Sequence, residues 1–263
     1  MTKPFQKSRP YIHISLDDVI KTFAQITYDD YGSIFNHPLL RFLKELHSKY
    51  GIVVSLYLFY ETDYDGARYN LAQFPECYRD EFVNNSEWLK LGFHGYNGKT
   101  DYGSEDAQKA KQDYLLTTSE ILRFTGSLDS IDKTPRLHSF SGSRDCLLAM
   151  RDAENGIVGL LAADDDRVSY YLDNSQNMSL RSYGYLFDSG LLFLKSNIRL
   201  ELIESMEYHL KKNMKLYFSR QSIVVFTHEW AMKNETLLKL EHFVKWGIRK
   251  GCTFDFPMDR LVK

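Results

Sequence analysis

Residues Tyr11–Val19, YIHISLDDV, form an apolar, β-branched run that ends in two adjacent carboxylates, Asp17 and Asp18. A run of this length bounded by polar residues predicts a buried strand rather than a helix. In barrels of parallel strands, residues at the C-terminal strand ends converge on the active site. Two acids placed there would repel each other unless a cation, a proton or a basic partner separated their roles. The alternative is that they cap the following helix, because Asp is a favoured N-cap residue.

Length and charge limit the class of protein. The chain has 263 residues, which suits one large α/β domain or two small ones, and we expect a single domain over residues 1–263. With 33 basic and 35 acidic residues it is nearly neutral, which argues against a nucleic-acid partner, since such binders usually carry a basic face. A hydrophobic content of 43% is ordinary for a globular protein with a buried core.

Cysteine usage and apolar runs predict the compartment. The three cysteines are far apart in the sequence and form no CxxC pair, so neither a disulfide framework nor a zinc ribbon is expected. The first ten residues contain no apolar segment typical of a signal peptide. The longest apolar run, Ile52–Tyr60, is too short to cross a bilayer as a helix. We therefore expect a cytoplasmic protein with no integral membrane segment.

Apolar strands alternate with amphipathic helical segments along the chain, which indicates parallel β/α units. About seven strands are expected from this pattern, at residues 11–19, 52–59, 88–94, 135–140, 157–163, 222–227 and 253–256. Residues 168–199 break the alternation and predict β-hairpins or an inserted lid. An irregular β/α barrel is favoured over a doubly wound sheet, because polar residues recur at the strand ends and no strand is followed by a Gly-rich nucleotide-binding turn.

Three of the eight histidines, His94, His138 and His228, end predicted strands. A single histidine at a strand end is most often a satisfied polar residue. Three of them together with Asp17 and Asp18 have the composition of a divalent metal site with a base beside it.

The order of these pieces resembles the polysaccharide deacetylase (NodB-homology) family of carbohydrate esterases. The motifs are ISLDDV, LGFHGYN, PRLHSF, AADDD and VVFTHEW, and they extend over roughly residues 11–256. Within the family, the chain is similar to the WbmS-type deacetylases of O-antigen or other surface-polysaccharide biosynthesis. The resemblance implies an irregular (β/α)7-type barrel of the glycoside hydrolase/deacetylase kind.

The resemblance also implies roles for particular residues. Asp17 matches the catalytic base, and Asp18 matches a metal ligand. His94 matches a second ligand, Arg136 falls where the family places an arginine that orients the base, and His228 matches the general acid. The implied cofactor is a divalent metal ion, and Zn²⁺ is the expected one.

The chain departs from the family pattern at one ligand position. The family usually has a second histidine four residues after the first, where this chain has Gly98, which offers no side chain. His138 could supply the third ligand from the next strand, and Asn97 or Asp101 could do so from the loop. We prefer His138, because an imidazole suits zinc better than an amide does.

Three further residues are candidate substrate contacts. Asp164 belongs to the acidic cluster 164–166 near the family's fourth motif, which lacks its usual Trp here; one of these acids could orient His228 or bind substrate, or all could be solvated. Tyr96 and Trp230 could line a sugar site, although core packing is the commoner role of an aromatic residue.

The expected function is metal-dependent removal of an N-acetyl (acyl) group from a carbohydrate, with a surface-polysaccharide (O-antigen or capsule) precursor as substrate. The expected partner is an N-acetylated sugar or a lipid- or nucleotide-linked glycan precursor. A hydrolase of a non-sugar amide is a further possibility, and two alternatives of other classes remain open at this stage. The missing histidine is compatible with a catalytically inactive glycan-binding protein on the same fold. A metal-independent glycoside hydrolase could instead use Asp17 and one of the acids 164–166.

Overall fold

The computed structural model describes residues 9–260 and places the predicted first strand at the centre of a parallel sheet. The strand order is β5-β2-β1-β10-β9, and β11 pairs with the start of β1. These strands are β1 (Tyr11–Val19), β2 (Val54–Phe59), β5 (Leu89–Gly95), β9 (Ile198–Arg199), β10 (Ser222–His228) and β11 (Thr253–Phe254). Since the neighbouring strands run parallel, their C-terminal ends meet at one edge, which is where the predicted site residues lie.

A second sheet completes the wall of strands that surrounds the interior of the molecule. Its order is β6-β8-β7, formed by Gly159–Ala162, Leu191–Lys195 and Tyr185–Asp188. Irregular segments join the two sheets on both sides: the amide of Asp132 bonds Leu91 O on β5, and the amide of Asn197 bonds Val224 O on β10, each at 2.8 Å. The strands therefore form an irregular β/α barrel, as predicted.

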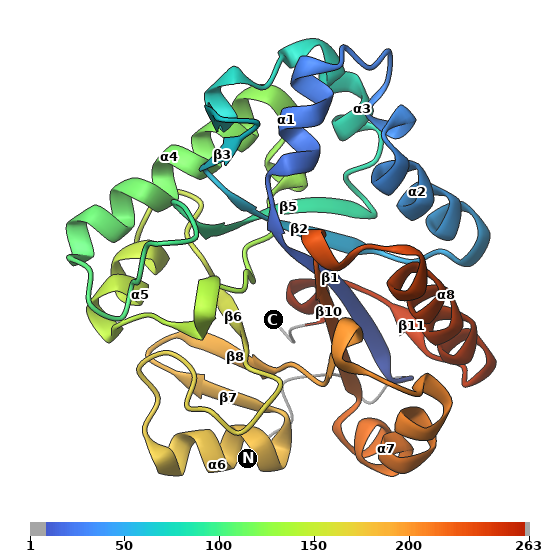
Figure 1. Cartoon of the computed structure of the whole chain (residues 1–263). Helices are drawn as coiled ribbons and strands as arrows, with labels where there is room; N and C mark the ends of the chain where they lie inside the picture. The colour runs from blue at the N-terminus through green and yellow to red at the C-terminus, as the bar shows by residue number, and fades with distance from the viewer. Residues whose placement is uncertain (1–8, 261–263) are drawn as a thin grey trace.

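Helices cover the outside of this wall (Figure 1). They are α1 (Lys21–Tyr28), α2 (Pro38–Tyr50), α3 (Arg79–Val83), α4 (Ala107–Thr125), α5 (Arg144–Arg151), α6 (Asn174–Tyr183), α7 (Met206–Arg220) and α8 (Asn234–Arg249). Helix α2 ends at Tyr50, because the next residue, Gly51, adopts a left-handed conformation with φ of 67°. No helix within residues 9–260 is both long enough and apolar enough to cross a membrane.

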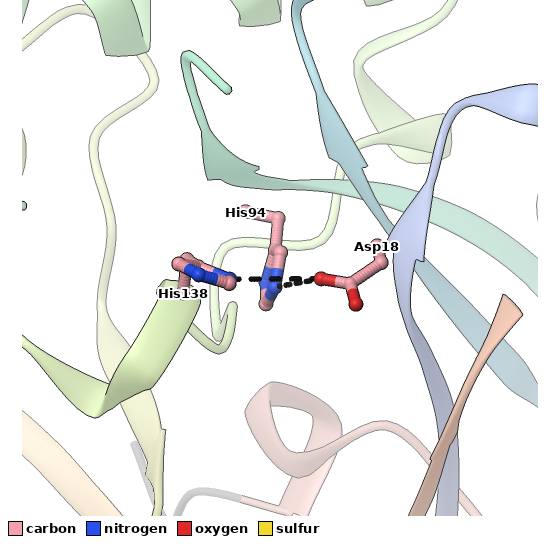
Figure 2. A group of neighbouring side chains, drawn as sticks. All are labelled: Asp18, His94 and His138. Atoms are coloured by element: carbon pink, nitrogen blue, oxygen red, sulfur yellow. Dashed lines mark hydrogen bonds and ion pairs between the residues drawn. The ribbon is translucent and has the colours of Figure 1, made fainter. Parts of the chain in front are cut away.

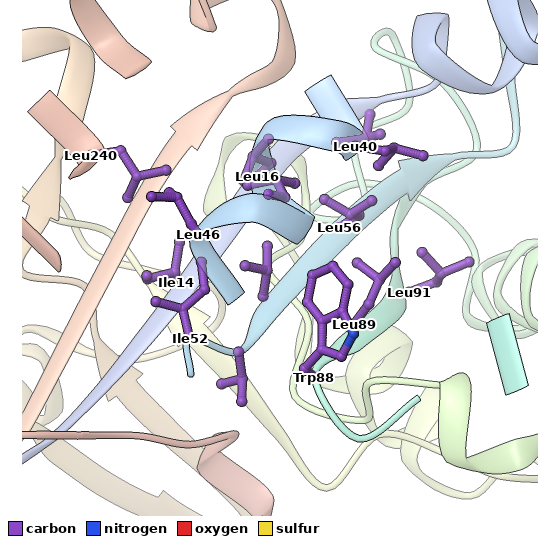
Figure 3. Close-up of a cluster of buried hydrophobic side chains, with 14 of the residues drawn as sticks. Ile14, Leu16, Leu40, Leu46, Ile52, Leu56, Trp88, Leu89, Leu91 and Leu240 are labelled. Atoms are coloured by element: carbon purple, nitrogen blue, oxygen red, sulfur yellow. The ribbon is translucent and has the colours of Figure 1, made fainter. Parts of the chain in front are cut away.

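The main core lies between the sheet and the covering helices (Figure 3). Ile14 of β1 and Leu56 of β2 are fully buried, and Leu46 of α2 and Leu240 of α8 are at most 4% exposed. Each such side chain contributes roughly 1.5–3 kcal/mol relative to full exposure. This packing makes β1 and β2 a rigid base for the residues at their ends.

The predicted strand over residues 135–140 is absent. Leu137 is extended, but residues His138–Phe140 form one 3-10 turn in which Ser139 and Phe140 have φ of 57° and 56°. These left-handed residues stop the strand, although the apolar spacing of PRLHSF is typical of one. The turn changes the direction of the chain at His138.

Two other segments differ in detail from the sequence expectations. Residues 168–199 contain helix α6 and the hairpin β7–β8, and the fully buried β8 pairs in parallel with β6 as part of the wall. The polar loop around Gly66 forms a small hairpin of β3 (Glu61–Tyr64) and β4 (Ala67–Asn70). Helix α7 begins at Met206, where the Ser205 hydroxyl caps it by accepting a hydrogen bond from the Tyr208 amide.

Candidate metal and catalytic site

The end of β1 is distorted where its two acids lie. The pairing of β1 with β2 shifts register between Leu16 and Val19, and Asp18 has φ of 59°. In a regular strand, adjacent side chains point to opposite faces. The irregularity lets neighbouring acids serve one site, and a left-handed conformation at a non-glycine residue costs about 1–3 kcal/mol, typical of a functional position.

Asp18, His94 and His138 converge on one point (Figure 2). Asp18 Oδ1 lies 3.1 Å from His94 Nε2 and 3.6 Å from His138 Nδ1. One ligand atom from each residue lies within 4.8 Å of the other two. Two imidazoles and a carboxylate are a ligand set that suits a divalent transition metal. These three residues can hold a metal ion.

The tautomer of His94 fits this interpretation. Its Nδ1–H donates to the carbonyl oxygen of Arg136 at 2.6 Å, because a carbonyl can only accept. In the neutral imidazole, Nε2 then carries a lone pair that faces the Asp18 carboxylate. Two acceptors that face each other need a cation between them or a second proton on the ring. A backbone partner on the distal nitrogen is a usual way to orient a metal-binding histidine.

The charge of Asp18 also supports the conclusion that these three residues can hold a metal ion. Burial alone would raise the pKa of the Asp18 carboxyl, but its interactions with the His138 and His94 rings hold that pKa well below its usual range. The Nε1–H of Trp230 also donates to Asp18 Oδ2 at 2.9 Å. Asp18 is therefore an ionised carboxylate with one oxygen aimed at the two imidazoles.

His138, the preferred candidate for the third ligand, lies beside His94. The Phe59 ring packs against both imidazoles, 4.9 Å from His94 and 5.3 Å from His138 between centroids. The other candidates make different contacts: Asn97 Oδ1 accepts the Lys99 amide at 3.0 Å, and Asp101 accepts the Ser141 hydroxyl at 2.5 Å.

Gly98 does not contribute to the set. A Cβ placed on Gly98 would lie 3.8 Å from the Phe59 ring. The sequence preference for His138 over the two loop residues therefore agrees with their positions.

Asp17 forms a buried ion pair with Arg136. Arg136 NH1 donates to Asp17 Oδ1 at 2.7 Å and to the Ser15 hydroxyl at 3.0 Å, and NH2 donates to the Ser196 hydroxyl at 3.0 Å. Both charged side chains are at most 2% exposed. The guanidinium also lies 3.9 Å from the centroid of Phe226. Together these contacts fix the direction of the Asp17 carboxylate.

His228 lies directly opposite Asp17 in the β1–β10 register. Its Nδ1 is 2.5 Å from Glu201 Oε1, and its ring stacks on Trp230 with centroids 4.9 Å apart. Burial alone would lower the pKa of His228, but the Glu201 hydrogen bond and the nearby charges of Asp17 and Asp18 raise it. His228 thus holds a proton more strongly than an ordinary histidine.

A cavity of about 150 Å³ connects these groups. Its lining includes Asp17, His94, Arg136, Leu137, His138, Ser139, Phe140, Arg167, Arg199 and His228. It can hold a small acyl group but not a whole sugar, so a sugar would sit outside the cavity. The Trp230 side chain, 59% exposed, lies next to it by its contacts with Asp18 and His228.

The other two substrate candidates lie outside the cavity lining. Asp164 Oδ1 pairs with Arg199 at 2.6 Å, and it is Arg199 that borders the cavity. The Tyr96 hydroxyl donates to Glu61 at 3.1 Å, and its ring stacks on Tyr60. Either residue could contact a bound sugar only at a part of the sugar that lies away from the reacting acyl group.

Two functional contacts were missed from sequence. The partner of His228 is Glu201 rather than one of the acids 164–166, and Glu201 lies in a 3-10 turn. The hydrogen bond from Arg136 to Ser196 was also not predicted from sequence. Ser196 is a polar residue directly after the apolar strand β8, and this position is the sequence feature that could have identified it.

Compared by sequence, the chain matches no known family profile and no curated protein. Its fold is similar to solved structures. These include the peptidoglycan N-acetylglucosamine deacetylase Bc1960 in complex with a naphthalenyl N-hydroxybenzamide, at 12% identity over 98% of this chain and 90% of that chain, with a TM-score of 0.51. A protein from Mycobacterium smegmatis assigned as a polysaccharide deacetylase matches at 10% identity over 97% and 90%, with a TM-score of 0.60.

A third similar structure is that of an enzyme named for a different reaction. The 4-alpha-glucanotransferase from Thermococcus litoralis matches at 12% identity over 96% of this chain and 40% of that chain, with a TM-score of 0.54. At such low identity these likenesses show the fold. The chain has the β/α-barrel fold of polysaccharide deacetylases, as the motifs predicted, and the chemistry has to be argued from the site.

Proposed function

We propose that this protein is a metal-dependent N-deacetylase of a carbohydrate. The observation that carries the proposal is the arrangement of three units around one cavity. The ligand set Asp18–His94–His138 forms one unit, the Arg136–Asp17 ion pair forms the second, and the Glu201–His228 pair forms the third.

Each unit supplies one requirement of amide hydrolysis. A metal ion held by the three ligands, with Zn²⁺ expected, would polarise the acyl carbonyl and acidify a water molecule. Asp17 would accept the proton of the attacking water, since Arg136 keeps the carboxylate oriented toward the site. His228, which holds its proton because of Glu201, would donate it to the departing amine. An amide needs this last step because an unprotonated amine leaves poorly.

A carbohydrate substrate is supported by the small cavity and the exposed Trp230 at its edge. The cavity suits an acetyl group, while an indole face next to it suits the apolar face of a sugar ring. One of the structures with this fold is a deacetylase that holds a hydroxamic acid, a class of compound that chelates metal ions. The motif resemblance adds a narrower proposal, a surface-polysaccharide precursor that is deacetylated in the cytoplasm.

The glycoside hydrolase alternative is less well supported. It needs two carboxylates across the site, but among the lining residues of the cavity Asp17 is the single acid. Asp164 is turned to Arg199 instead. The glycan-binding alternative is also less well supported, because His138 lies within ligand distance of Asp18 and His94 and could replace the ligand that Gly98 cannot supply.

The test is release of acetate from N-acetylated oligosaccharides by the purified protein. We expect activity with added zinc, loss of activity in EDTA, and inhibition by a hydroxamic acid. Asp17→Asn should bind metal normally but lose activity by about 10²–10⁴-fold. Activity that persists in EDTA, or an Asp17→Asn variant as active as the unaltered protein, would overturn the proposal.

A further inference from the structure

A second cavity, of about 520 Å³, lies between α6, the end of β8 and α7. It shares no lining residue with the catalytic cavity. Its wall includes the cations Arg181, Lys195 and Arg220 together with the polar side chains of Ser182 and Asn197. The whole chain has a net charge of −2, so this concentration of positive charge is local.

Lys195 is a buried cation that lacks an acidic partner. Lys195 is the last residue of β8 and is 9% exposed. Nζ donates to the carbonyl oxygens of Ala163, at 2.6 Å, and Asp165, and no ion pair is formed within the described part of the chain. Burial lowers the pKa of Lys195 to about 8, although the charges of Asp164 and Asp165 act in the opposite direction.

Arg220 is a second cation without an acidic partner among the described residues, and its side chain is half-buried. Its NH2 donates to the carbonyl oxygen of Arg181, and its buried Nε has no hydrogen-bond partner among residues 9–260. Burial lowers its pKa as well. A guanidinium with a buried unpaired N–H is unfavourable unless a ligand supplies the acceptor.

The acids near this cavity are already paired. Arg181 pairs with Asp166 at 2.5 Å, and Asp164 pairs with Arg199 on the side of the catalytic cavity. Lys195 and Arg220 therefore remain as two cations without a carboxylate partner in the described structure. A dianion would balance both charges.

We propose that this cavity is a binding site for a phosphate-bearing molecule. Guanidinium groups match phosphate oxygens in geometry, and a phosphate supplies both the double charge and the acceptors that the two cations need. The volume is in the range of small-molecule sites, large enough for a sugar phosphate or a nucleotide. The inference does not depend on the proposed deacetylase activity.

The site is connected to the catalytic centre through Ser196. Ser196 lines the phosphate cavity, and its hydroxyl accepts a hydrogen bond from Arg136, the residue that holds Asp17. Asp164 lines the same cavity and holds Arg199 of the catalytic cavity. An occupant of the phosphate cavity would thus contact the residues behind the general base.

The experiment is calorimetric titration of the full chain with pyrophosphate. We expect saturable binding that weakens with added salt, and a loss of about tenfold or more in Arg220→Gln, since the variant lacks a charge-assisted hydrogen bond to the ligand. Arg181→Gln, at a side chain 41% exposed that folding tolerates, should also weaken binding. Lys212→Gln removes the same charge from an exposed position of α7 outside the cavity, and it should bind like the unaltered protein.

A further variant separates this site from the metal site, which could itself attract pyrophosphate. His94→Ala should bind pyrophosphate as tightly as the unaltered protein. Loss of binding in His94→Ala, equal binding in all variants, or no binding at all would overturn the proposal. Tight binding of citrate in place of pyrophosphate would also overturn it, because the ligand class would then be carboxylate.

Discussion

Trp230 Nε1–H donates a hydrogen bond to Asp18 Oδ2 at 2.9 Å across 212 residues of sequence. The same indole stacks on His228. One exposed side chain therefore connects the metal-ligand carboxylate with the expected general acid. This contact leaves Asp18 Oδ1 as the oxygen that faces the two histidines.

Trp230→Phe tests this connection. The phenyl ring can still stack on His228 but cannot donate a hydrogen bond to Asp18. Partners that orient a metal ligand typically contribute 10–100-fold in affinity, so we expect weaker zinc binding by about tenfold with the fold intact. Zinc competition with a chromogenic chelator measures it, and an unchanged zinc affinity would show that the hydrogen bond does not orient Asp18.

Arg136→Met tests the buried ion pair. It leaves the Asp17 carboxylate buried without its counter-charge, which typically costs about 3–5 kcal/mol. We expect the free energy of unfolding in urea to fall by that amount and deacetylation to be lost. Arg249→Met, at an exposed position of α8, is the matched control and should unfold like the unaltered protein. Equal stability of the two variants would contradict the assigned role of Arg136.

Glu201→Gln tests the proton on His228. Because Glu201 raises the pKa of His228 above its ordinary 6.5, activity that needs the protonated ring should fall as the pH rises through that raised value. Glutamine removes the charge, so the alkaline limb of kcat/KM should move to lower pH. A pH–rate profile with an unmoved alkaline limb would exclude His228 as the proton donor.

The same pair makes a prediction for stability. A histidine whose pKa is raised on folding stabilises the protein below its unfolded pKa, about 6.5, and loses this contribution as the pH rises through the folded value. The unaltered protein should therefore lose this part of its unfolding free energy above about pH 6.5, while Glu201→Gln, in which only Asp17 and Asp18 still raise the pKa of His228, should lose less. Urea titrations at pH 6 and pH 9 compare the two proteins, and identical pH dependence would argue against the pairing.

The sequence was informative where a polar residue follows an apolar strand. Asp17, Asp18, His94 and His228 all stand at the ends of strands that were predicted from periodicity, and parallel strands bring such ends together.

His138 was predicted to lie near the end of a strand, but the structure places it in a 3-10 turn. It lies in a turn set by two left-handed residues, and such backbone conformations leave no mark in hydrophobic spacing. The contacts of Glu201 and Trp230 could not be predicted from the sequence, because they join side chains of segments that are distant in sequence.

The measurement that tests the central claim most directly is the metal content of the purified protein. We expect close to one zinc per chain after incubation with zinc, and loss of the metal in both His94→Ala and His138→Ala. His242→Ala, which removes an exposed histidine of α8, should retain it. Full metal content in His138→Ala, or no metal in the unaltered protein, would contradict the site proposed here.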